Sequence, residues 1–326
     1  MTTLPTYDDV LLAQRRIAGQ VVRTPMLRNA ALDERTGGTI LIKPEPLQRT
    51  GSFKMRGAAN AVLSLSAAER APGLVAHSSG NHAQAVACIA AAMGVSATIV
   101  MPADAPRMKM AATRAWGAAI IPYDRVTEDR EALSAAFVAR TGAVLIPPFD
   151  HPDVIAGQGT VGLELAEDAR AAGLRMDALL VCTGGGGLVA GCGLAMAGAS
   201  QQTAIYAVEP EDSDDTARSL AAGIRLANRP GGSGLCDALL TPMPGAMTFA
   251  INRVQLTGGL RVSDDEVLAA MAFAFTHLKI VVEPGGAVAL AAVLSGRFAA
   301  RGRVVGVVLS GGNVDSAVFA RAMSVA

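Results

Sequence analysis

The sequence alternates between short apolar runs and longer alanine-rich stretches, and this alternation constrains the fold more than any other feature. The apolar runs are residues 39–43, 74–77, 97–101, 119–122, 143–146, 178–181, 205–208 and 304–309. Runs without polar alternation are typical of strands that are buried on both faces of a sheet. Apolar residues of helical period recur between them at 57–65, 83–93, 107–116, 130–140, 157–172, 188–197, 265–276 and 286–294. The pattern predicts an open α/β fold of parallel strands, with ligands bound at the carboxyl ends of the strands.

The composition excludes several other classes of protein. Lys and Arg together number 28, as do Asp and Glu, so the chain lacks the basic excess of a nucleic-acid-binding protein. With 51% hydrophobic and 17% charged residues, the chain is too apolar for a disordered protein. Because only 4% of the residues are aromatic, we expect the core to consist of small aliphatic side chains packed at close approach.

The sequence also predicts a compartment. Its first ten residues, MTTLPTYDDV, contain neither the basic nor the apolar segment of a signal peptide. Two uncharged stretches resemble membrane spans, but a turn at Met93-Gly94 divides one of them and a glycine run interrupts the other. The cysteines form no CxxC pair, so we interpret them as reduced thiols packed as small apolar side chains. We expect a cytoplasmic protein without membrane or nucleic-acid partners.

Four consecutive glycines form the strongest local signal, and we call Gly184, Gly185, Gly186 and Gly187 the glycine run. The run follows the strand expected at 178–181 and precedes the helix expected at 188–197. Its backbone N–H groups can turn toward one anion, and the helix dipole adds to the attraction. Because the run matches neither GxGxxG nor the Walker pattern, we expect a phosphate monoester as the ligand. A purely structural turn is the alternative.

Two other strand ends carry polar residues. The first, which we call the 78–82 loop, comprises Ser78, Ser79, Gly80, Asn81 and His82. Its N–H groups, hydroxyls and amide suit a carboxylate or a phenolate, although an ordinary helix N-cap is the alternative. The second begins at Ser310, directly after the strand expected at 304–309, where a common turn is the alternative.

Lysine is scarce, and one lysine stands at a helix start. The complete set is Lys43, Lys54, Lys109 and Lys279. Lys54 lies where a loop enters the helix expected at 57–65, and the helix dipole there lowers the pKa of an amine toward that of a nucleophile. A solvated surface lysine is the alternative. A phosphate cup, an activated lysine and a carboxylate cradle are together what an enzyme needs to hold pyridoxal phosphate as a Schiff base and to seat an amino acid against it.

In its motifs the sequence resembles the fold-type II pyridoxal-phosphate enzymes, and among them the threonine/serine dehydratase and serine racemase group. The motifs are EPLQRTGSFKMRGA at 45–58, SSGNHAQ at 78–84, IAGQGT at 155–160, the glycine run, VEP at 208–210, EPGGA at 283–287 and SGGNVD at 310–315. They occur in family order over nearly the whole chain, and together they are highly specific. The resemblance implies a tryptophan synthase β-like fold, with two open, mostly parallel sheets in two lobes and the cofactor in the cleft.

The resemblance also implies a role for each residue of the site. Lys54 is implied to form the Schiff base, with Phe53 near the cofactor ring, Asn81 on its 3′-oxygen and Ser310 on its pyridine nitrogen. The groups implied to bind the phosphate are the N–H groups of Gly184, Gly185, Gly186, Gly187 and Leu188. Those implied to hold the substrate carboxylate are Ser78, Ser79, Gly80, Asn81 and His82. Arg130, by its distance from the IAGQGT motif, resembles a substrate-loop arginine.

The expected organisation follows from the same resemblance. A small substrate-side lobe, residues 61–147, is inserted into a large cofactor-binding lobe made of residues 1–60 and 148–326. Such proteins are usually homodimers, so we expect a homodimer with a small amino acid as the substrate.

Several reactions remain open. In a threonine or serine dehydratase (ammonia-lyase), Lys54 removes the Cα proton, the β-hydroxyl leaves, and the product hydrolyses to a 2-oxo acid and ammonia. The neutral hydroxyl of Ser310 favours elimination over transamination. A serine racemase needs a second acid or base, for which the motif places Ser79, whereas Ser79 binding only the carboxylate is the alternative. The sequence does not separate threonine, serine and 3-hydroxyaspartate as substrates, and the intact lysine and glycine run disfavour a non-catalytic scaffold.

An acidic segment predicts a cation site beside the cofactor. Five carboxylates stand within residues 209–215. Carboxylates at i and i+6 and a carbonyl oxygen at i+4 can converge around a turn on a hard cation. The resemblance to serine racemase implies the same positions, with the side chains of Glu209 and Asp215 and the carbonyl oxygen of Ser213 binding Mg²⁺, or Mn²⁺ or Ca²⁺ in its place. A solvated acidic loop is the alternative.

Overall fold

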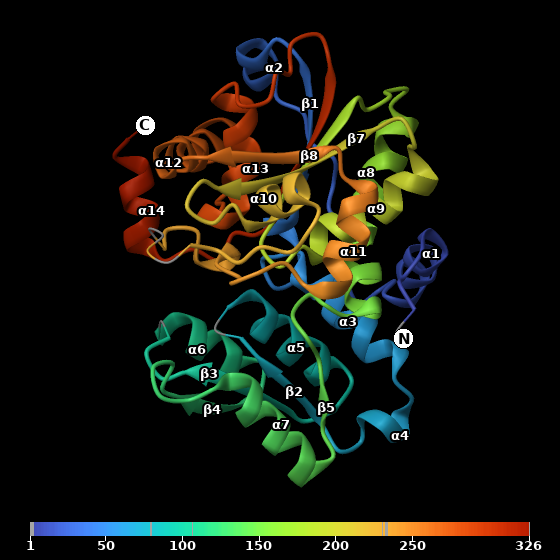
Figure 1. Ribbon diagram of the computed structural model, residues 1–326, viewed down its shortest axis with the longest axis vertical. Coiled ribbons are helices and arrows are strands. Elements are labelled where there is room, and N and C mark those ends of the chain that lie inside the picture. Colours follow the sequence, from blue (N-terminus) through green and yellow to red (C-terminus); the bar gives the residue numbers. More distant parts are fainter. Residues whose placement is uncertain (1–2, 79, 106, 230, 232–233, 326) are drawn as a thin grey trace.

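The computed structural model describes residues 3–78, 80–105, 107–229, 231 and 234–325, and its strands form two separate sheets (Figure 1). The larger sheet contains β1 (Thr39–Pro44), β6 (Ala178–Cys182), β7 (Ala204–Pro210), β8 (Gly258–Val262) and β9 (Val304–Leu309). The smaller sheet contains β2 (Leu74–His77), β3 (Ala97–Pro102), β4 (Ala119–Tyr123) and β5 (Val144–Leu145).

The strand order confirms the predicted class of fold. The larger sheet has the order β1-β9-β6-β7-β8 and the smaller sheet the order β4-β3-β2-β5, and every neighbouring pair is parallel. All the apolar runs expected to be strands lie in these sheets. Only β8 escaped prediction, because its sequence GGLRV has neither a long apolar run nor strong β propensity, and it lies at an edge.

Helices cover both sheets. Those of the larger lobe are α1 (Tyr7–Arg16), α2 (Ala30–Thr36), α3 (Lys54–Ser64), α8 (Pro152–Ala171), α9 (Gly187–Ala199), α10 (Asp215–Ala222), α11 (Ala246–Gln255), α12 (Asp264–Phe273), α13 (Pro284–Leu294) and α14 (Ser316–Met323). Around the smaller sheet lie α4 (Ala67–Arg70), α5 (Asn81–Ala92), α6 (Arg107–Ala115) and α7 (Arg130–Thr141). The short turns are η1 (Glu45–Leu47), η2 (Asp237–Leu239) and the π-helical η3 (Ala274–Leu278). No helix among the described residues is long and apolar enough to cross a membrane.

Small residues let the central helices approach closely, as the low aromatic content predicts. A Cβ atom added to Gly159 of α8 would lie 2.7 Å from the carbonyl oxygen of Gly191 in α9. One added to Gly157 would lie 2.7 Å from the carbonyl oxygen of Arg56 in α3. Since α3 also packs against α5, it connects the core of the larger lobe to that of the smaller one.

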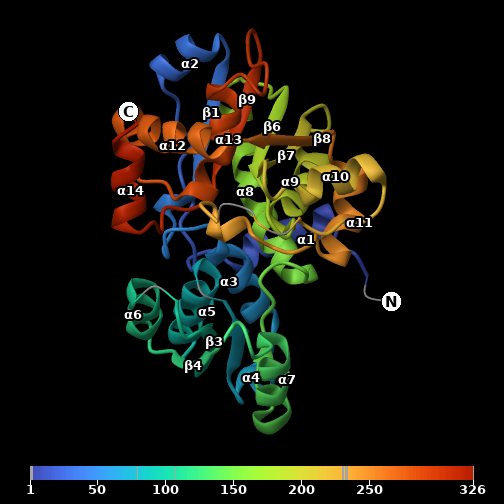
Figure 2. The ribbon, with the colours of Figure 1, turned by 60° about the vertical axis from the view of Figure 1, so that its left-hand side comes forward.

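The carboxyl ends of strands from both sheets point into the space between the lobes (Figure 2). Strand β6 leads into the glycine run, β9 leads to Ser310, and β2 leads into the 78–82 loop. The three strand ends that the sequence analysis singled out therefore meet in one place, where ligands bind in open α/β folds.

Candidate active site

A cavity of about 590 Å³ lies between the two lobes, within the size range of small-molecule sites. Its wall in the larger lobe includes the glycine run, Leu188 and Ser310, and its wall in the smaller lobe includes Ser78, Gly80, Asn81, His82 and Arg130. Phe53 and Lys54 lie on the same cavity. The structure therefore brings together every described residue predicted to contact cofactor or substrate. Ser79 lies outside the described residues.

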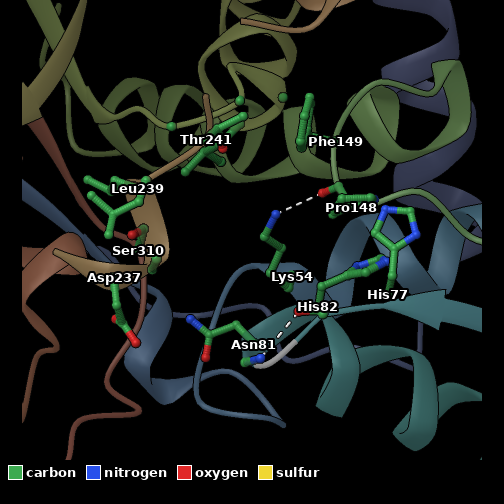
Figure 3. Close-up of a pocket in the computed structure, with 18 of the residues that line it drawn as sticks. Lys54, His77, Asn81, His82, Pro148, Phe149, Asp237, Leu239, Thr241 and Ser310 are labelled. Carbon is green, nitrogen blue, oxygen red and sulfur yellow. Dashed lines mark hydrogen bonds between the residues drawn. The ribbon is translucent and has the colours of Figure 1, made fainter. Parts of the chain in front are cut away.

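Lys54 is the first residue of α3, and its side chain extends into the middle of the cavity (Figure 3). Its Nζ donates a hydrogen bond to the carbonyl oxygen of Pro148 at 2.7 Å and lies 5.1 Å from the centre of the Phe53 ring. Burial lowers the pKa of Lys54 to about 8, against the opposing effect of the Glu283 carboxylate. The direction agrees with the sequence analysis, but loss of water, rather than the helix dipole, is the main cause.

The loop before Lys54 is held against the loop that contains Ser310. The N–H of Phe53 donates to the carbonyl oxygen of Ser310 at 3.0 Å, and the N–H of Gly312 donates to that of Gly51 at 2.9 Å. Gly51 has a φ of 72°, a conformation that favours glycine, and a Cβ atom there would lie 2.7 Å from Oδ1 of Asn313. These contacts fix the position of Lys54 relative to Ser310.

The glycine run forms a tight turn at the start of α9. A Cβ atom added to Gly185 would lie 2.6 Å from the Phe149 ring, and one added to Gly187 would lie 3.0 Å from Cβ of Phe149. Gly186 adopts a φ of 89°. The first N–H groups of a helix have no acceptor within it, so this turn presents free donors and a positive dipole end to the cavity. The arrangement fits the phosphate of pyridoxal phosphate.

In the 78–82 loop, His82 is a neutral, buried residue. Its Nε2 lies 2.8 Å from the carbonyl oxygen of Ile146, which can only accept, so Nε2 carries the proton. Burial lowers the pKa of His82 to about 3, with a further effect of Lys54. Its Nδ1 has no hydrogen-bond partner among the described residues. His82 therefore brings no positive charge to a substrate carboxylate.

Glu283, for which the sequence analysis proposed no role, lies beside Asn81. Its Oε1 accepts a hydrogen bond from Nδ2 of Asn81 at 2.7 Å, and its side chain lines the cavity. Burial, together with Asp237, raises the pKa of Glu283 to about 7. The signal available in the sequence was the motif EPGG, which places a carboxylate directly before the start of α13.

Charged residues surround the open side of the cavity. Arg130, at the start of α7, is exposed and makes no ion pair among the described residues, whereas Nζ of Lys109 in α6 reaches Oδ2 of Asp237 across the cleft at 2.5 Å. His77 lies on the same wall, and burial, then Arg130, lowers its pKa. The sequence analysis did not single out His77 or Lys109, because neither lies in a motif that it interpreted as part of a site.

The three predicted metal-site residues lie together at the end of β7. Asp215 is fully buried, and burial raises the pKa of its carboxyl to about 6 against the opposing effect of Asn228 nearby. Glu209 accepts hydrogen bonds from the N–H groups of Thr216 and Ala217, at 2.9 and 2.8 Å, and burial followed by Asp215 raises its pKa to about 8. Ser213 is also buried. No group of three or more His, Cys, Asp or Glu side chains among the described residues could hold a metal.

Comparison with known proteins agrees with this geometry. A family model described as "Pyridoxal-phosphate dependent enzyme" matches residues 17–311. The chain is 46% identical over 322 residues to L-threo-3-hydroxyaspartate ammonia-lyase of Saccharomyces cerevisiae, with 98% of this chain and 97% of that protein covered. It is 39% identical to serine racemase of Schizosaccharomyces pombe, with 98% of each covered. The crystal structure of a threonine deaminase from T.th. matches with a TM-score of 0.90 and 44% identity, over 95% of this chain and 99% of that one.

These matches show that the protein is a fold-type II enzyme that uses pyridoxal phosphate. The chain belongs to the pyridoxal-phosphate-dependent enzyme family and, within it, to the group of ammonia-lyases and racemases.

Proposed function

We propose that the protein converts a β-hydroxy amino acid to a 2-oxo acid and ammonia, with pyridoxal phosphate held by Lys54. One observation carries the proposal: the amine of Lys54 projects into a cavity that has the glycine run and Ser310 on one side and the 78–82 loop on the other. The bound cofactor supplies an electron sink for the bonds at the substrate Cα atom. The protein supplies the binding groups and the acid and base.

Lys54 is the proposed base. With a pKa of about 8, its amine is neutral in a minor fraction of molecules near physiological pH, a far larger fraction than for an ordinary lysine, and the neutral form can remove the proton from Cα. Ser310, 3% exposed at the end of β9, would contact the pyridine nitrogen with a neutral hydroxyl. The N–H groups from Gly184 to Leu188 would hold the phosphate, and Phe53 would lie beside the ring.

The 78–82 loop is the proposed site of the substrate carboxylate. Ser78 and Asn81 offer side-chain donors, Gly80 offers backbone, and α5 begins at Asn81 with its dipole toward the ligand. His82 holds the loop to Ile146. On the motif alone, we propose that Ser79, which lies outside the described residues, also contacts the carboxylate and acts as a second acid or base.

Threonine and serine are the main proposed substrates, and 3-hydroxyaspartate is a second candidate. Arg130 favours the latter, because this guanidinium on the cavity wall makes no ion pair among the described residues and suits a second substrate carboxylate. The names of two relatives, the hydroxyaspartate ammonia-lyases of Saccharomyces cerevisiae and Pseudomonas sp, support it as well.

A panel of L- and D-β-hydroxy amino acids tests the proposal. Release of 2-oxo acid and loss of optical rotation are followed together for threonine, serine and both 3-hydroxyaspartate diastereomers. We expect 2-oxo acid from at least one L-substrate. Loss of rotation without 2-oxo acid would assign the protein to the racemases instead, and the absence of both reactions across the panel would overturn the proposal.

We also propose a structural Mg²⁺ ion, replaceable by Mn²⁺ or Ca²⁺, at Glu209, Ser213 and Asp215. The burial of two neighbouring carboxylates, Glu209 and Asp215, supports it, because a buried carboxylate is costly unless a cation or a donor compensates it. The expected ligand set needs only two carboxylates and a carbonyl oxygen, with water completing the coordination. The ion would order the segment after β7 and take no part in the chemistry.

The remaining expectations are proposals as well. We propose lobe boundaries at residues 60/61 and 147/148; the first falls within α3, which packs against both α8 and α5, and the four strands of the smaller sheet lie between residues 74 and 145. We propose a homodimer, and a cytoplasmic location is supported by four buried cysteines that are all free thiols.

A further inference from the structure

Three side chains from distant parts of the sequence form a hydrogen-bonded chain beside the cavity. Nδ2 of Asn313 donates to Oδ1 of Asn81 at 2.7 Å, and Nδ2 of Asn81 donates to Oε1 of Glu283 at 2.7 Å. Asn81 belongs to the smaller lobe, whereas Asn313 and Glu283 flank β9 and α13 of the larger lobe. Figure 3 shows the amide of Asn81 on the side of the site that also holds Asp237 and Ser310.

The partners determine which way each amide points. Asn313 also donates from Nδ2 to the carbonyl oxygen of Thr50 at 2.9 Å. A carbonyl oxygen only accepts, so this position must be nitrogen, and its second N–H must face the oxygen of Asn81. The Nδ2 atom of Asn81 then faces Glu283 and donates one of its two N–H groups to that carboxylate. The second N–H group of Asn81 remains for a ligand in the cavity.

Asn313 and Glu283, the two ends of this hydrogen-bonded chain, are held tightly. Asn313 follows the segment that is bonded to the Lys54 loop through Gly51 and Gly312, and Gly51 leaves room for its side chain. At the other end, a Cβ atom on Gly311 would lie only 2.3 Å from Oε1 of Glu283, so the glycine leaves room for this carboxylate, and the N–H of Glu283 donates to the carbonyl oxygen of Gly311 at 3.0 Å. Glu283 is 3% exposed, which leaves its oxygens few competing partners in water.

We propose that Asn313 and Glu283 are positioning residues that hold the Asn81 amide with its remaining N–H toward the 3′-oxygen of bound pyridoxal phosphate. The inference rests on the proposed placement of the cofactor on Lys54. A donor at this oxygen stabilises its charged form. The bound cofactor then favours the tautomer that carries a charged 3′-oxygen and absorbs visible light, over the neutral-oxygen tautomer that absorbs in the near ultraviolet.

The substitution Asn313→Asp tests the direction of the amide. A carboxylate of nearly the same shape accepts but does not donate, so it is repelled by Oδ1 of Asn81 and favours the flipped amide. We expect the ratio of the visible to the near-ultraviolet band to fall about tenfold, as the loss of a hydrogen bond to a charged group implies. Cofactor content, measured as phosphate after denaturation, should stay near one per chain. An unchanged ratio at full occupancy contradicts the proposal.

Two control variants separate orientation from charge. Glu283→Gln removes the charge but keeps a carbonyl oxygen that can accept from Asn81, so we expect a ratio within about twofold of the wild type. Asp237→Asn removes a neighbouring charge that takes no part in the hydrogen-bonded chain of Asn313, Asn81 and Glu283. We expect the band ratio of this variant to stay within about twofold of the wild type as well. If Glu283→Gln raises the ratio about as much as Asn313→Asp lowers it, charge near the cofactor, and not amide orientation, controls the spectrum and the proposal is wrong.

A second variant covers a failure of Asn313→Asp to fold. Asn313→Ala removes the donor without adding a charge, and we expect a fall of about threefold in the band ratio, with the melting temperature of the cofactor-free protein reported beside it. An unchanged ratio contradicts the proposal here too. If the wild-type protein itself binds no cofactor on Lys54, the proposed function fails, and that result is distinct from any of these ratios.

Discussion

The glycine run and the 78–82 loop occupy equivalent places in the two sheets, since each joins a buried parallel strand to the start of a helix. They differ in what surrounds them. A Cβ atom on Gly185 would lie 2.6 Å from the Phe149 ring, whereas a Cβ atom on Gly80 would meet nothing within 4 Å in the part of the chain that the structure describes. Phe149, in the segment 146–150 between the lobes, thus packs against the glycine run. Gly80 in the 78–82 loop faces the open cavity instead.

The difference indicates that the two turns bind different ligands. The tightly packed turn, together with the Lys54 loop bonded to Ser310 and Gly312, suits a cofactor that stays bound. The open loop suits a substrate that enters and leaves with every turnover. The larger lobe should therefore determine cofactor affinity, and the smaller lobe substrate affinity.

The largest effect should come from adding a methyl group to the packed turn. Gly185→Ala should cost about 1–3 kcal/mol in cofactor binding, up to roughly a hundredfold in Kd, because the methyl group overlaps the Phe149 ring. The matched change Gly80→Ala should leave cofactor Kd within about twofold, because its methyl group meets open space. Equilibrium titration of the cofactor-free variants measures both. Equal losses in the two variants would remove the distinction between the turns.

The rate at which cofactor-free protein captures pyridoxal phosphate should depend on the pH through Lys54. Only the neutral amine attacks the aldehyde, and the pKa of Lys54 is about 8, so the rate should rise about tenfold per pH unit from pH 6 and level off above pH 8. The lowered pKa also means that the folded protein loses this proton before the unfolded chain does. Stability of the cofactor-free protein should therefore rise between pH 8 and about 10.5. Stopped-flow absorbance measures the capture rate at each pH. A pH profile of that rate with its midpoint near 10.5 would show that Lys54 is a solvated lysine.

Removal of the proposed divalent cation should lower the stability of the larger lobe. At ten times its Kd, an ion bound only to the folded state stabilises it by about 1.4 kcal/mol, and a chelator should remove that stabilisation. We expect a lower melting temperature and faster loss of cofactor, both restored by Mg²⁺, Mn²⁺ or Ca²⁺. Asp215→Asn should abolish the response to the metal. A variant that still responds as the wild type does would place the ion elsewhere.

The smallest effect should come from the ion pair across the cleft. Lys109→Met removes the contact with Asp237, whose side chain is 52% exposed, so global stability should change by less than about 1 kcal/mol. Because the pair lies on the open side, KM for the amino acid should change by severalfold while cofactor Kd does not. Asp237→Asn is the matched variant. A change confined to cofactor Kd would contradict the division between the lobes.

The sequence predicted the structure correctly wherever a feature depends on residues that are close together in the sequence. Continuous apolar runs predicted the parallel strands, and the position of Lys54 at a helix start, with the motifs around it, predicted the site residue in the cavity. Glu283 and Lys109 could not be found in this way, because their importance arises from contacts with Asn81 and Asp237, 202 and 128 positions away in the sequence. Local patterns also gave the wrong main cause for the pKa of Lys54, since burial depends on the whole fold.

The most direct test of the account is to locate the bond to the cofactor. Borohydride reduction of the protein with bound pyridoxal phosphate converts the Schiff base to a stable amine, and peptide mass spectrometry then identifies the modified lysine. The account predicts one phosphopyridoxyl group per chain on Lys54, and none in Lys54→Ala, which should also lose the visible absorption band. Modification of Lys43, Lys109 or Lys279 in its place, or an unchanged band in Lys54→Ala, would contradict it.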